Sequence, residues 1–338
     1  MITASPQSRL SPAAPDWRAL WRDAITDPKE LLRAVGLGER TDLIPPDDAG
    51  FALRVPRGFV ARMRHNDPTD PLLLQVLPQA AEHDRVAGFT MDAVGDMASR
   101  TGQGFLHKYH GRALLIASGS CAVNCRYCFR RHFPYGEEIA AAGQWRDALA
   151  QLEADPSISE LILSGGDPLS LATSKLADLS RGLAEMPHVR RLRIHTRLPV
   201  VLPERIDDAF LKWLASLPLQ KVVVLHANHA NEFDAGVDAA CARLRGAGAT
   251  LLNQSVLLRG INNHVDTLTD LSERMFAAGV LPYYLHQLDR VHGTAHFEVG
   301  DAEAMALLEA LRARLPGYLV PRLVREIGGD TSKRPIGG

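Results

Sequence analysis

The sequence is poor in cysteine and has no strong excess of charge of one sign. Its 338 residues include four cysteines, three of them within eight positions, which does not fit a framework of disulfides. The net charge of −1 excludes a basic field that would attract nucleic acid, so no nucleic-acid partner is expected. No apolar run approaches the length of a membrane span, and the first ten residues lack the apolar core of a signal peptide. We therefore expect a cytoplasmic protein with no membrane attachment, where thiols stay reduced.

Short apolar runs recur at a regular spacing from residue 113 onward. After the run at residues 113–117, five runs begin at residues 161, 192, 222, 250 and 281, at intervals of 31, 30, 28 and 31 residues. These intervals match a strand–helix–strand unit, and amphipathic patterns over residues 207–217 and 234–246 predict helices within them. Strands that alternate with helices pair in parallel through right-handed crossovers. The sequence therefore predicts an α/β fold with a partial (β/α)6 barrel.

Composition divides the chain into four expected segments. Residues 1–16 are rich in Ser, Ala and Pro and predict a flexible tail. Residues 17–104, the N-terminal region, read as helices and loops, and no local pattern in them indicates site chemistry. Residues 105–320 form the predicted barrel, and residues 321–338 form a short C-terminal segment.

Three cysteines are crowded directly after the first predicted strand. Residues 121–128 read Cys-Ala-Val-Asn-Cys-Arg-Tyr-Cys, so Cys121, Cys125 and Cys128 have the spacing C-x3-C-x2-C. A [4Fe–4S] cluster normally takes four cysteines, so three would leave one iron open to a small molecule. A zinc site that adds His132 is the alternative, although structural zinc sites more often use two separate cysteine pairs. Cys241 falls in a helical pattern and is expected to be buried and apolar.

Distinct motifs also follow the other predicted strands. Residues 164–169 read Ser-Gly-Gly-Asp-Pro-Leu, for which a tight glycine turn before a helix is the alternative interpretation. Further motifs begin with Ile-His-Thr-Arg at residue 194, Leu-His-Ala-Asn-His at residue 225 and Asn-Gln-Ser-Val at residue 253. Together with residues 121–133, here called the cysteine loop, these motifs resemble the lysine 2,3-aminomutase family of radical S-adenosylmethionine (SAM) enzymes. The resemblance extends from about residue 105 to residue 336 and keeps the family's order of motifs.

The resemblance implies an isomerase that moves an amino group within lysine, using a [4Fe–4S] cluster, SAM and pyridoxal 5′-phosphate (PLP). Residues 326–336, here called the lysine segment, read Glu-Ile-Gly-Gly-Asp-Thr-Ser-Lys-Arg-Pro-Ile, and the resemblance makes Lys333 the catalytic lysine that forms a Schiff base with PLP. Taken alone, a lysine in such a tail is usually solvated. The implied cofactor-binding residues are Lys108, Arg112, Tyr127, Gly165, Gly166, Asp167, Thr196, Arg197, His226, Gln254 and Lys333.

Two of these residues are expected at the phosphate group of PLP. Lys108 stands where the family has an arginine, and a lysine can hold phosphate as a point charge with less bidentate geometry. Arg112 is the second cation, although it could simply open the first strand.

The resemblance also implies a set of substrate-binding residues. Arg130 matches the family's clamp on the substrate carboxylate, where a guanidinium fits bidentately, while its neighbour Arg131 could instead be a partner in a surface ion pair. Asp289 and Glu326 match the acidic groups that bind the distal ammonium of lysine, with Glu326 one methylene longer than the family's aspartate.

One branch of the family fits best. Residues 284–289 and 325–329, Tyr-Leu-His-Gln-Leu-Asp and Arg-Glu-Ile-Gly-Gly, resemble the enzymes that make (R)-β-lysine for elongation factor P. That branch implies free lysine as substrate, an external one-electron reductant of the flavodoxin or ferredoxin type, and a functional link to an elongation factor P lysine ligase. An aminomutase for another amino acid and a non-catalytic protein with a structural zinc or Fe–S centre are the alternatives. The oligomeric state, monomer or homo-oligomer, stays open.

Overall fold

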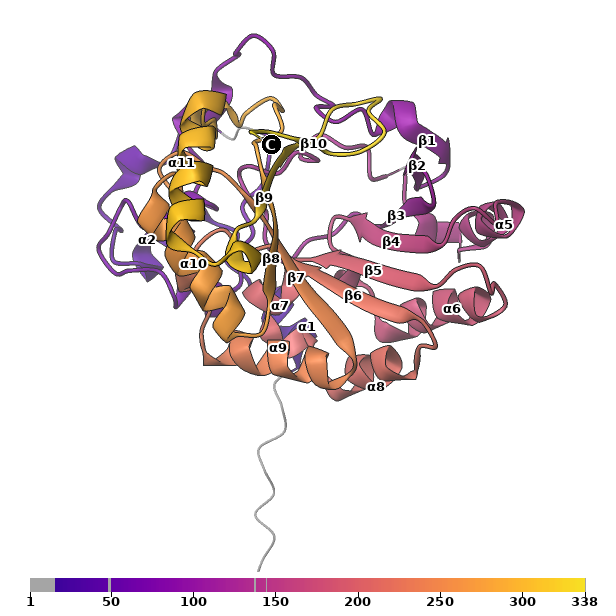
Figure 1. Ribbon diagram of the computed structural model, residues 1–338. Helices are drawn as coiled ribbons and strands as arrows, with labels where there is room; N and C mark the ends of the chain where they lie inside the picture. Colours follow the sequence, from indigo (N-terminus) through magenta and orange to yellow (C-terminus); the bar gives the residue numbers. More distant parts are fainter. Residues whose placement is uncertain (1–15, 48–49, 137, 144, 338) are drawn as a thin grey trace, which may run out of the picture.

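The computed structural model describes residues 16–47, 50–136, 138–143 and 145–337 (Figure 1). The predicted tail, residues 1–16, lies outside the described residues except for Asp16, whose carboxylate accepts a hydrogen bond from the Arg18 amide and caps the first helix. None of the helices in the described ranges is long and apolar enough to cross a membrane.

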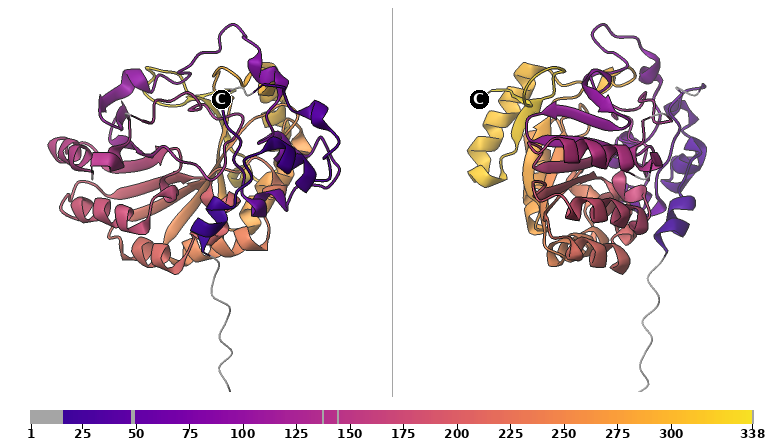
Figure 2. Two further views of the ribbon diagram at one scale, coloured as in Figure 1. Left: turned by 180° about the vertical axis from the view of Figure 1, so that it is seen from behind. Right: turned by 90° about the vertical axis from the view of Figure 1, so that its right-hand side faces the viewer.

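The described residues form one sheet of ten strands in sequential order (Figures 1 and 2). Neighbouring strands from β3 to β9 are parallel, whereas β1, β2 and β10 pair antiparallel at the two ends of the sheet. The strands are β1 (Arg100–Gly102), β2 (Phe105–Tyr109), β3 (Arg112–Ser118), β4 (Glu160–Gly165), β5 (Arg191–Thr196), β6 (Gln220–Leu225), β7 (Ala249–Val256), β8 (Leu281–His286), β9 (Arg322–Arg325) and β10 (Arg334–Pro335).

The six predicted strands are confirmed as β3 to β8, and with them the mixed α/β fold with a mostly parallel sheet. The other four strands were not predicted, because each is five residues or shorter. Two of them alter the expected segments: β1 falls within the N-terminal region, and β9 joins the C-terminal segment to the sheet beside β8. The segment boundaries therefore remain predictions.

Helices alternate with the parallel strands and lie on the outside of the curved sheet (Figure 1). The predicted helices at residues 207–217 and 234–246 are confirmed as α8 and α9, which begin after Asp207 and Asp234; the carboxylates of these aspartates accept from the amides of Phe210 and Val237. The α-helices are α1 (Trp17–Arg22), α2 (Pro28–Ala34), α3 (Arg57–Val60), α4 (Pro71–Leu74), α5 (Arg146–Ala154), α6 (Thr173–Ala184), α7 (Leu198–Val201), α8 (Asp208–Ser216), α9 (Ala235–Gly246), α10 (Val265–Ala277) and α11 (Asp301–Arg314). The short 3₁₀ turns are η1 (Thr41–Leu43), η2 (Ala80–His83), η3 (Met97–Ser99), η4 (Ala140–Gly143), η5 (Pro168–Ser170), η6 (Pro203–Arg205), η7 (Ala230–Glu232), η8 (Ala295–Phe297) and η9 (Gly317–Leu319).

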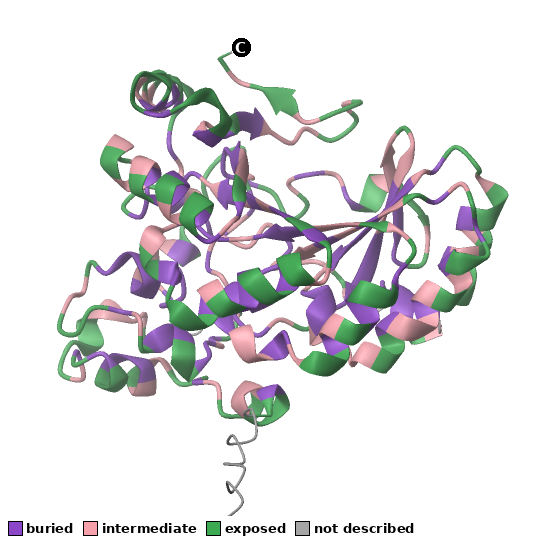
Figure 3. Ribbon diagram, turned by 60° about the horizontal axis from the view of Figure 1, so that its bottom comes forward, coloured by how far each residue is buried: buried purple, intermediate pink, exposed green. Residues whose placement is uncertain are grey.

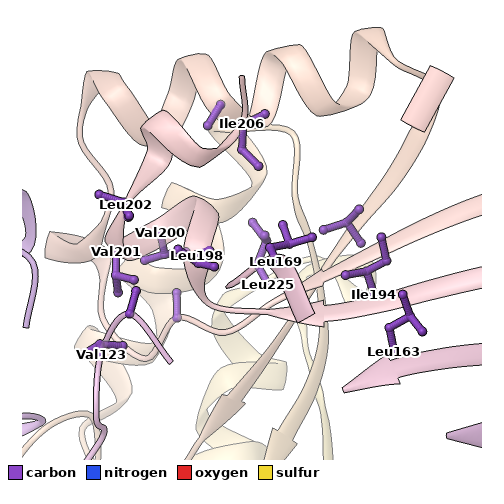
Figure 4. Packing of buried hydrophobic residues seen from close by; sticks show 14 of the residues in the cluster. Val123, Leu163, Leu169, Ile194, Leu198, Val200, Val201, Leu202, Ile206 and Leu225 are labelled. Atoms are coloured by element: carbon purple, nitrogen blue, oxygen red, sulfur yellow. The ribbon is translucent and has the colours of Figure 1, made fainter. Parts of the chain in front are cut away.

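The main hydrophobic core lies between the sheet and its helices (Figure 3). Side chains alternate along a strand, so on β5 the buried Leu192 and Ile194 belong to this core while Arg193 and His195 lie on the other face of the sheet. The N-terminal region joins the same core through buried side chains such as Phe59. Figure 4 shows part of this packing around α7 and the strand ends: Val123, Leu163, Leu169, Ile194, Leu198, Val200, Val201, Leu202, Ile206 and Leu225.

Candidate active site

The cysteine loop begins three residues after the end of β3, at the carboxyl end of the parallel strands. Cys121, Cys125 and Cys128 are partly accessible, whereas Cys241 is fully buried in α9, as expected. Burial, then the neighbouring Cys125, raises the pKa of the Cys128 thiol to about 11. Burial, then Cys128, likewise raises the pKa of Cys121. The thiols are thus close enough to oppose one another's ionisation, a repulsion that a cationic metal centre would relieve.

The zinc alternative depends on His132 as a fourth ligand. Among the described residues, no group of three or more His, Cys, Asp and Glu side chains is arranged to hold a metal ion. His132, the fourth ligand in the zinc alternative, instead places its ring Nε2 at 3.2 Å from the carbonyl oxygen of His292. The donor set therefore fits a multi-iron cluster held by Cys121, Cys125 and Cys128.

Buried ion pairs attach the cysteine loop to the N-terminal region. Arg126 is fully buried, and its Nε donates to the carboxylate of Glu82 at 2.8 Å while its Nη1 donates to the Phe51 carbonyl at 2.6 Å. Arg131 donates to the same Glu82 carboxylate at 2.7 Å. Arg131 is therefore a buried structural partner, not a surface one. No local pattern in residues 17–104 indicated a role at the site, yet Glu82 of this region holds two arginines of the cysteine loop.

The glycine pair after β4 packs directly on the start of the cysteine loop. A Cβ at Gly165 would lie 2.6 Å from the Ser118 carbonyl oxygen, and one at Gly166 would lie 2.7 Å from that of Ser120. Gly165 also has φ of +119°, which a side chain would disfavour. The Gly166 amide donates to the Ser118 carbonyl at 2.7 Å. At these two glycines no side chain covers the backbone, so SAM could contact it directly. That contact stays a prediction.

Asp167 and Thr196 bond to each other. The buried Asp167 carboxylate accepts from the Thr196 hydroxyl at 2.7 Å and from the backbone amides of Arg197 and Leu198 at 2.8 and 3.1 Å. Burial raises its pKa to about 6, against these hydrogen bonds, which lower it. Asp167 therefore joins the ends of β4 and β5. Its predicted contact with a cofactor would be a second role beside this structural one.

Arg197 lies against one of the cluster cysteines. Its Nη1 donates to the Cys125 sulfur at 2.6 Å and to the Tyr127 hydroxyl at 2.7 Å, and its Nη2 donates to the carboxylate of Glu232 at 2.9 Å. The structure thus brings two predicted cofactor-binding residues, Arg197 and Tyr127, to the cysteine loop itself. Their direct contact with a cofactor stays a prediction.

Neutral imidazoles line the inner face of the sheet. The Nε2 of His226 lies 2.9 Å from the side-chain nitrogen of Gln254, so these two predicted residues are brought together. Burial lowers the pKa of His226 to about 3 and lowers the pKa values of His195 and His286 well below their ordinary value. The Nε2 atoms of His195 and His286 are buried and have no hydrogen-bond partner within the described ranges. The sequence interpretation did not single out these two, although their alternation with apolar neighbours on β5 and β8 was the available signal.

The lysine segment crosses the open side of the sheet toward β1 and β2 (Figure 1). Lys333 forms an ion pair with Glu326, and Glu326 also accepts from Lys108 of β2 at 3.0 Å. Burial raises the pKa of Glu326, but the charges of Lys333 and Lys108 outweigh this and lower it to about 2. A carboxylate between two lysines therefore bridges the two ends of the partial barrel.

Asp289 lies near this carboxylate, in the loop after β8. Its Oδ1 is buried and has no hydrogen-bond partner in the part of the chain that the structure describes. Burial, then the charge of Glu326, raises the pKa of Asp289 to about 7. Two carboxylates, one of them unpartnered, are thus near Lys333, as a pocket for a cationic end group requires.

The two predicted phosphate cations differ in their freedom. Lys108 donates to the Val94 carbonyl at 2.9 Å and to the Glu326 carboxylate at 3.0 Å, and it forms an ion pair with Asp96 at 2.6 Å. Arg112 opens β3 and packs its guanidinium over the Tyr109 ring at 5.1 Å. Arg112 is therefore the better candidate for phosphate.

Arg130 is buried and already partly engaged. Its Nε donates to the Asp96 carboxylate at 2.7 Å and its Nη1 to the Ser164 hydroxyl at 2.9 Å. A two-nitrogen fork of the predicted kind would need one of these bonds to open, since Nη2 alone makes no hydrogen bond among the described residues.

The fold and the cysteine loop define a class of cluster-binding enzyme built on a partial barrel. Residues 102–190 match the family model of a 4Fe-4S single cluster domain. The chain is 49% identical to the L-lysine 2,3-aminomutase of Escherichia coli (strain K12) and 45% identical to that of Haemophilus influenzae, covering 96–97% of this chain and of both relatives. It is 32% identical to the L-lysine 2,3-aminomutase of Clostridium subterminale over 95% of this chain and 77% of that protein. The chain belongs to the lysine 2,3-aminomutase family of radical SAM enzymes.

Proposed function

We propose that this protein is an isomerase that converts L-α-lysine to β-lysine with a [4Fe–4S] cluster, SAM and PLP. The observation that carries the choice of substrate is the carboxylate of Asp289, whose buried Oδ1 has no hydrogen-bond partner among the described residues and which lies near the partly buried Glu326 and Lys333. An amino acid with a cationic end group would satisfy that carboxylate, whereas an acidic amino acid would add repulsion. Arg130 offers a cation for the other end of the same molecule.

Cys121, Cys125 and Cys128 would hold the cluster, the glycine pair would hold SAM, and Lys333 with Arg112 would hold PLP. When bound, the cluster and SAM supply a carbon radical that removes a hydrogen atom, and PLP supplies the π-system across which an amino group migrates. Lys333 must release its ion pair with Glu326 before its amine can act as a nucleophile.

The protein's own side chains would fix the substrate at both ends. Arg130 would bind the carboxylate through Nη2, since its other nitrogens are bonded to Asp96 and Ser164. Asp289 would accept the distal ammonium, and it must be ionised to do so. The imidazoles of His195, His226 and His286 stay neutral, because burial lowers their pKa values, and so they add no cation that would repel the substrate.

We further assign the product as (R)-β-lysine for a ligase that modifies elongation factor P. This assignment is supported by the resemblance of residues 284–289 and 325–329 to that branch, and by 49% identity to one relative against 32% to the clostridial one. A flavodoxin- or ferredoxin-type protein would supply the electron, and the enzyme would work in the cytoplasm.

Anaerobic reconstitution tests the proposal. The protein would be loaded with iron, sulfide, PLP and SAM, reduced, and incubated with L-lysine, and the products would be separated by chiral chromatography. We expect (R)-β-lysine. The (S) enantiomer would contradict the elongation factor P assignment alone. A fully loaded protein that leaves lysine unchanged and rearranges another amino acid would overturn the choice of substrate.

A further inference from the structure

Five charged side chains form a continuous series of ion pairs across the site, and their charges alternate in sign. The series runs from Arg130 through Asp96, Lys108 and Glu326 to Lys333, and each member contacts the next at 3.0 Å or less. It connects the predicted carboxylate-binding residue to the predicted PLP lysine. Asp96 links Arg130 to the rest of the series, because its carboxylate pairs with both Arg130 and Lys108.

We propose that Asp96 is a positioning residue for the substrate site, which holds the guanidinium of Arg130 directly and the carboxylate of Glu326 through Lys108. The two groups that face opposite ends of the amino acid are thereby kept at a fixed separation. This inference rests on the proposed function and deepens it, because it assigns what sets the spacing of the substrate-binding groups.

The geometry at Arg130 supports this role. Asp96 is only 2% exposed, and its Oδ2 accepts from Arg130 Nε at 2.7 Å. Ser164 of β4 accepts from Nη1 at 2.9 Å, so two partners orient the guanidinium plane and direct Nη2 toward the remaining space. An arginine held at two nitrogens binds a carboxylate with less loss of side-chain freedom than a loose one.

The geometry at Lys108 extends the same hold to the lysine segment. The Lys108 ammonium donates hydrogen bonds to Glu326 and the Val94 carbonyl and forms an ion pair with Asp96 at 2.6 Å. Lys108 therefore acts here as a link between two carboxylates.

The backbone around Asp96 is itself fixed. Asp92 accepts from the amides of Asp96 and Met97 at 3.0 Å each, which secures the turn that precedes η3. Gly95 has φ of +65°, and a Cβ there would lie 3.4 Å from the Cα of Gly328. The turn that carries Asp96 thus packs against the lysine segment. The series of ion pairs and the backbone packing therefore connect the same two parts of the protein.

The test compares Asp96→Asn and Asp96→Glu with a matched control, Glu160→Gln. Glu160 is also a buried carboxylate between two arginines, Arg191 and Arg193, but it lies at the first residue of β4, the opposite end of the parallel strands from the cysteine loop. For Asp96→Asn we expect the KM for lysine to rise on the order of tenfold to a hundredfold, since small misplacements of binding groups have effects of that size. Asp96→Glu keeps the charge, so its KM for lysine should lie between those of Asp96→Asn and the unmodified enzyme. The KM of Glu160→Gln should equal that of the unmodified enzyme.

Two measurements that do not depend on turnover complete the test. Phenylglyoxal labelling of the ligand-free protein, followed by peptide mass spectrometry, should show Arg130 reacting on the order of tenfold faster in Asp96→Asn and unchanged in Glu160→Gln. The affinity for PLP, read from its absorbance, should stay within about threefold in Asp96→Asn, because Lys108 is not the phosphate ligand.

Every outcome of these measurements either supports or overturns the proposal. Unchanged Arg130 labelling, or a tenfold loss of PLP affinity with an unchanged KM for lysine, overturns the proposal. If Asp96→Asn does not fold, Asp96→Glu carries the test, and a KM and Arg130 labelling like those of the unmodified protein reject it. If the unmodified protein makes no β-lysine, the proposed function fails, while the labelling still shows whether Asp96 holds Arg130.

Discussion

The cysteine loop and the lysine segment carry the side chains proposed to bind the cluster and PLP, but the two segments are held by different forces. Arg126 and Glu82, which secure the cysteine loop, have fully buried side chains, and Arg131 adds a second buried cation to the same carboxylate. In the lysine segment, Arg334 and Asp330 form an ion pair whose side chains are 60% and 27% exposed, and both residues of β10 are exposed.

The difference corresponds to what each segment must do. Ligands of a cluster must keep a fixed spacing, and buried charge pairs provide this because breaking them is costly. A lysine that exchanges partners at a cofactor must move, and exposed pairs permit this because each contributes little to stability. Lys333 nevertheless starts from a defined position, set by its ion pair with Glu326. The following predictions break or sharpen this contrast, beginning with the largest effect.

Removing a cluster ligand should have the largest effect. Each of Cys121→Ala, Cys125→Ala and Cys128→Ala should lose nearly all of the roughly four irons expected for a [4Fe–4S] cluster. Iron analysis after anaerobic reconstitution, with absorbance near 420 nm, measures this. Cys241→Ala is the control and should load fully, because Cys241 is buried in α9. Full loading of Cys125→Ala would refute the three-cysteine site.

Neutralising the carboxylate that pairs with the cysteine loop tests the contrast directly. Glu82→Gln leaves Arg126 and Arg131 buried without a counter-ion, and we expect the free energy of unfolding to fall by about 3–5 kcal/mol. Denaturant titration of the ligand-free protein measures it. Glu30→Gln is the control: its pair with Arg57 is exposed and should contribute less than about 1 kcal/mol. Equal losses in the two variants would show that the loop is not held by this pair.

Much of the fold was predictable, because it depends on local patterns. The runs that became β4 to β8 are apolar, evenly spaced and separated by amphipathic helices, so their spacing alone indicated the parallel sheet. Strands β1, β2, β9 and β10 are only two to five residues long, so no apolar run marks them, although β1 with β2 and β9 with β10 pair between residues that are close in the sequence.

The site was predictable only where a motif carries it. Cys121 follows a strand at a recognisable spacing, whereas Glu82 and Asp96 lie in irregular segments and act on arginines 44 and 34 residues away in the sequence. No local pattern marks such a contact, because the partner is brought close only by the packing of the N-terminal region on the barrel. For Lys108, the position in the sequence suggests a phosphate ligand, which stays a prediction, while the structure adds contacts with the carboxylates of Asp96 and Glu326 that no local pattern indicates.

Asp289 lies beside the lysine segment and should affect catalysis more than structure. Asp289→Asn removes the proposed partner of the distal ammonium, and kcat/KM for lysine should fall by on the order of a hundredfold, with iron and PLP still bound. Steady-state kinetics with iron and PLP analysis measure this. A variant that turns over lysine like the unmodified enzyme would remove the argument for a cationic substrate.

The pH dependence of the same residue adds a second measurement. The pKa of Asp289 is raised to about 7, so the carboxylate ionises as the pH rises through 7, and the KM for lysine should fall between pH 6 and pH 8. The sign for stability is the opposite: a folded-state pKa above the unfolded value means that ligand-free stability declines as pH rises through 7. Asp289→Asn should lose both trends. A KM trend that persists in the variant would assign the titration to another group.

The smallest effect on stability is expected at Lys333. Lys333→Ala removes one partner of Glu326, but Lys108 still contacts that carboxylate at 3.0 Å, so the free energy of unfolding should fall by less than about 1 kcal/mol. The chemical effect should be complete: borohydride reduction of the PLP-loaded protein should label Lys333, and Lys333→Ala should take up no covalent label. Lys175→Ala, at an exposed position of α6, is the control and should label normally. Labelling at Lys108 in the unmodified protein would reject the assignment of Lys333. A loss of several kcal/mol in Lys333→Ala would instead show that the lysine segment is held as firmly as the cysteine loop, and that the contrast between them is not real.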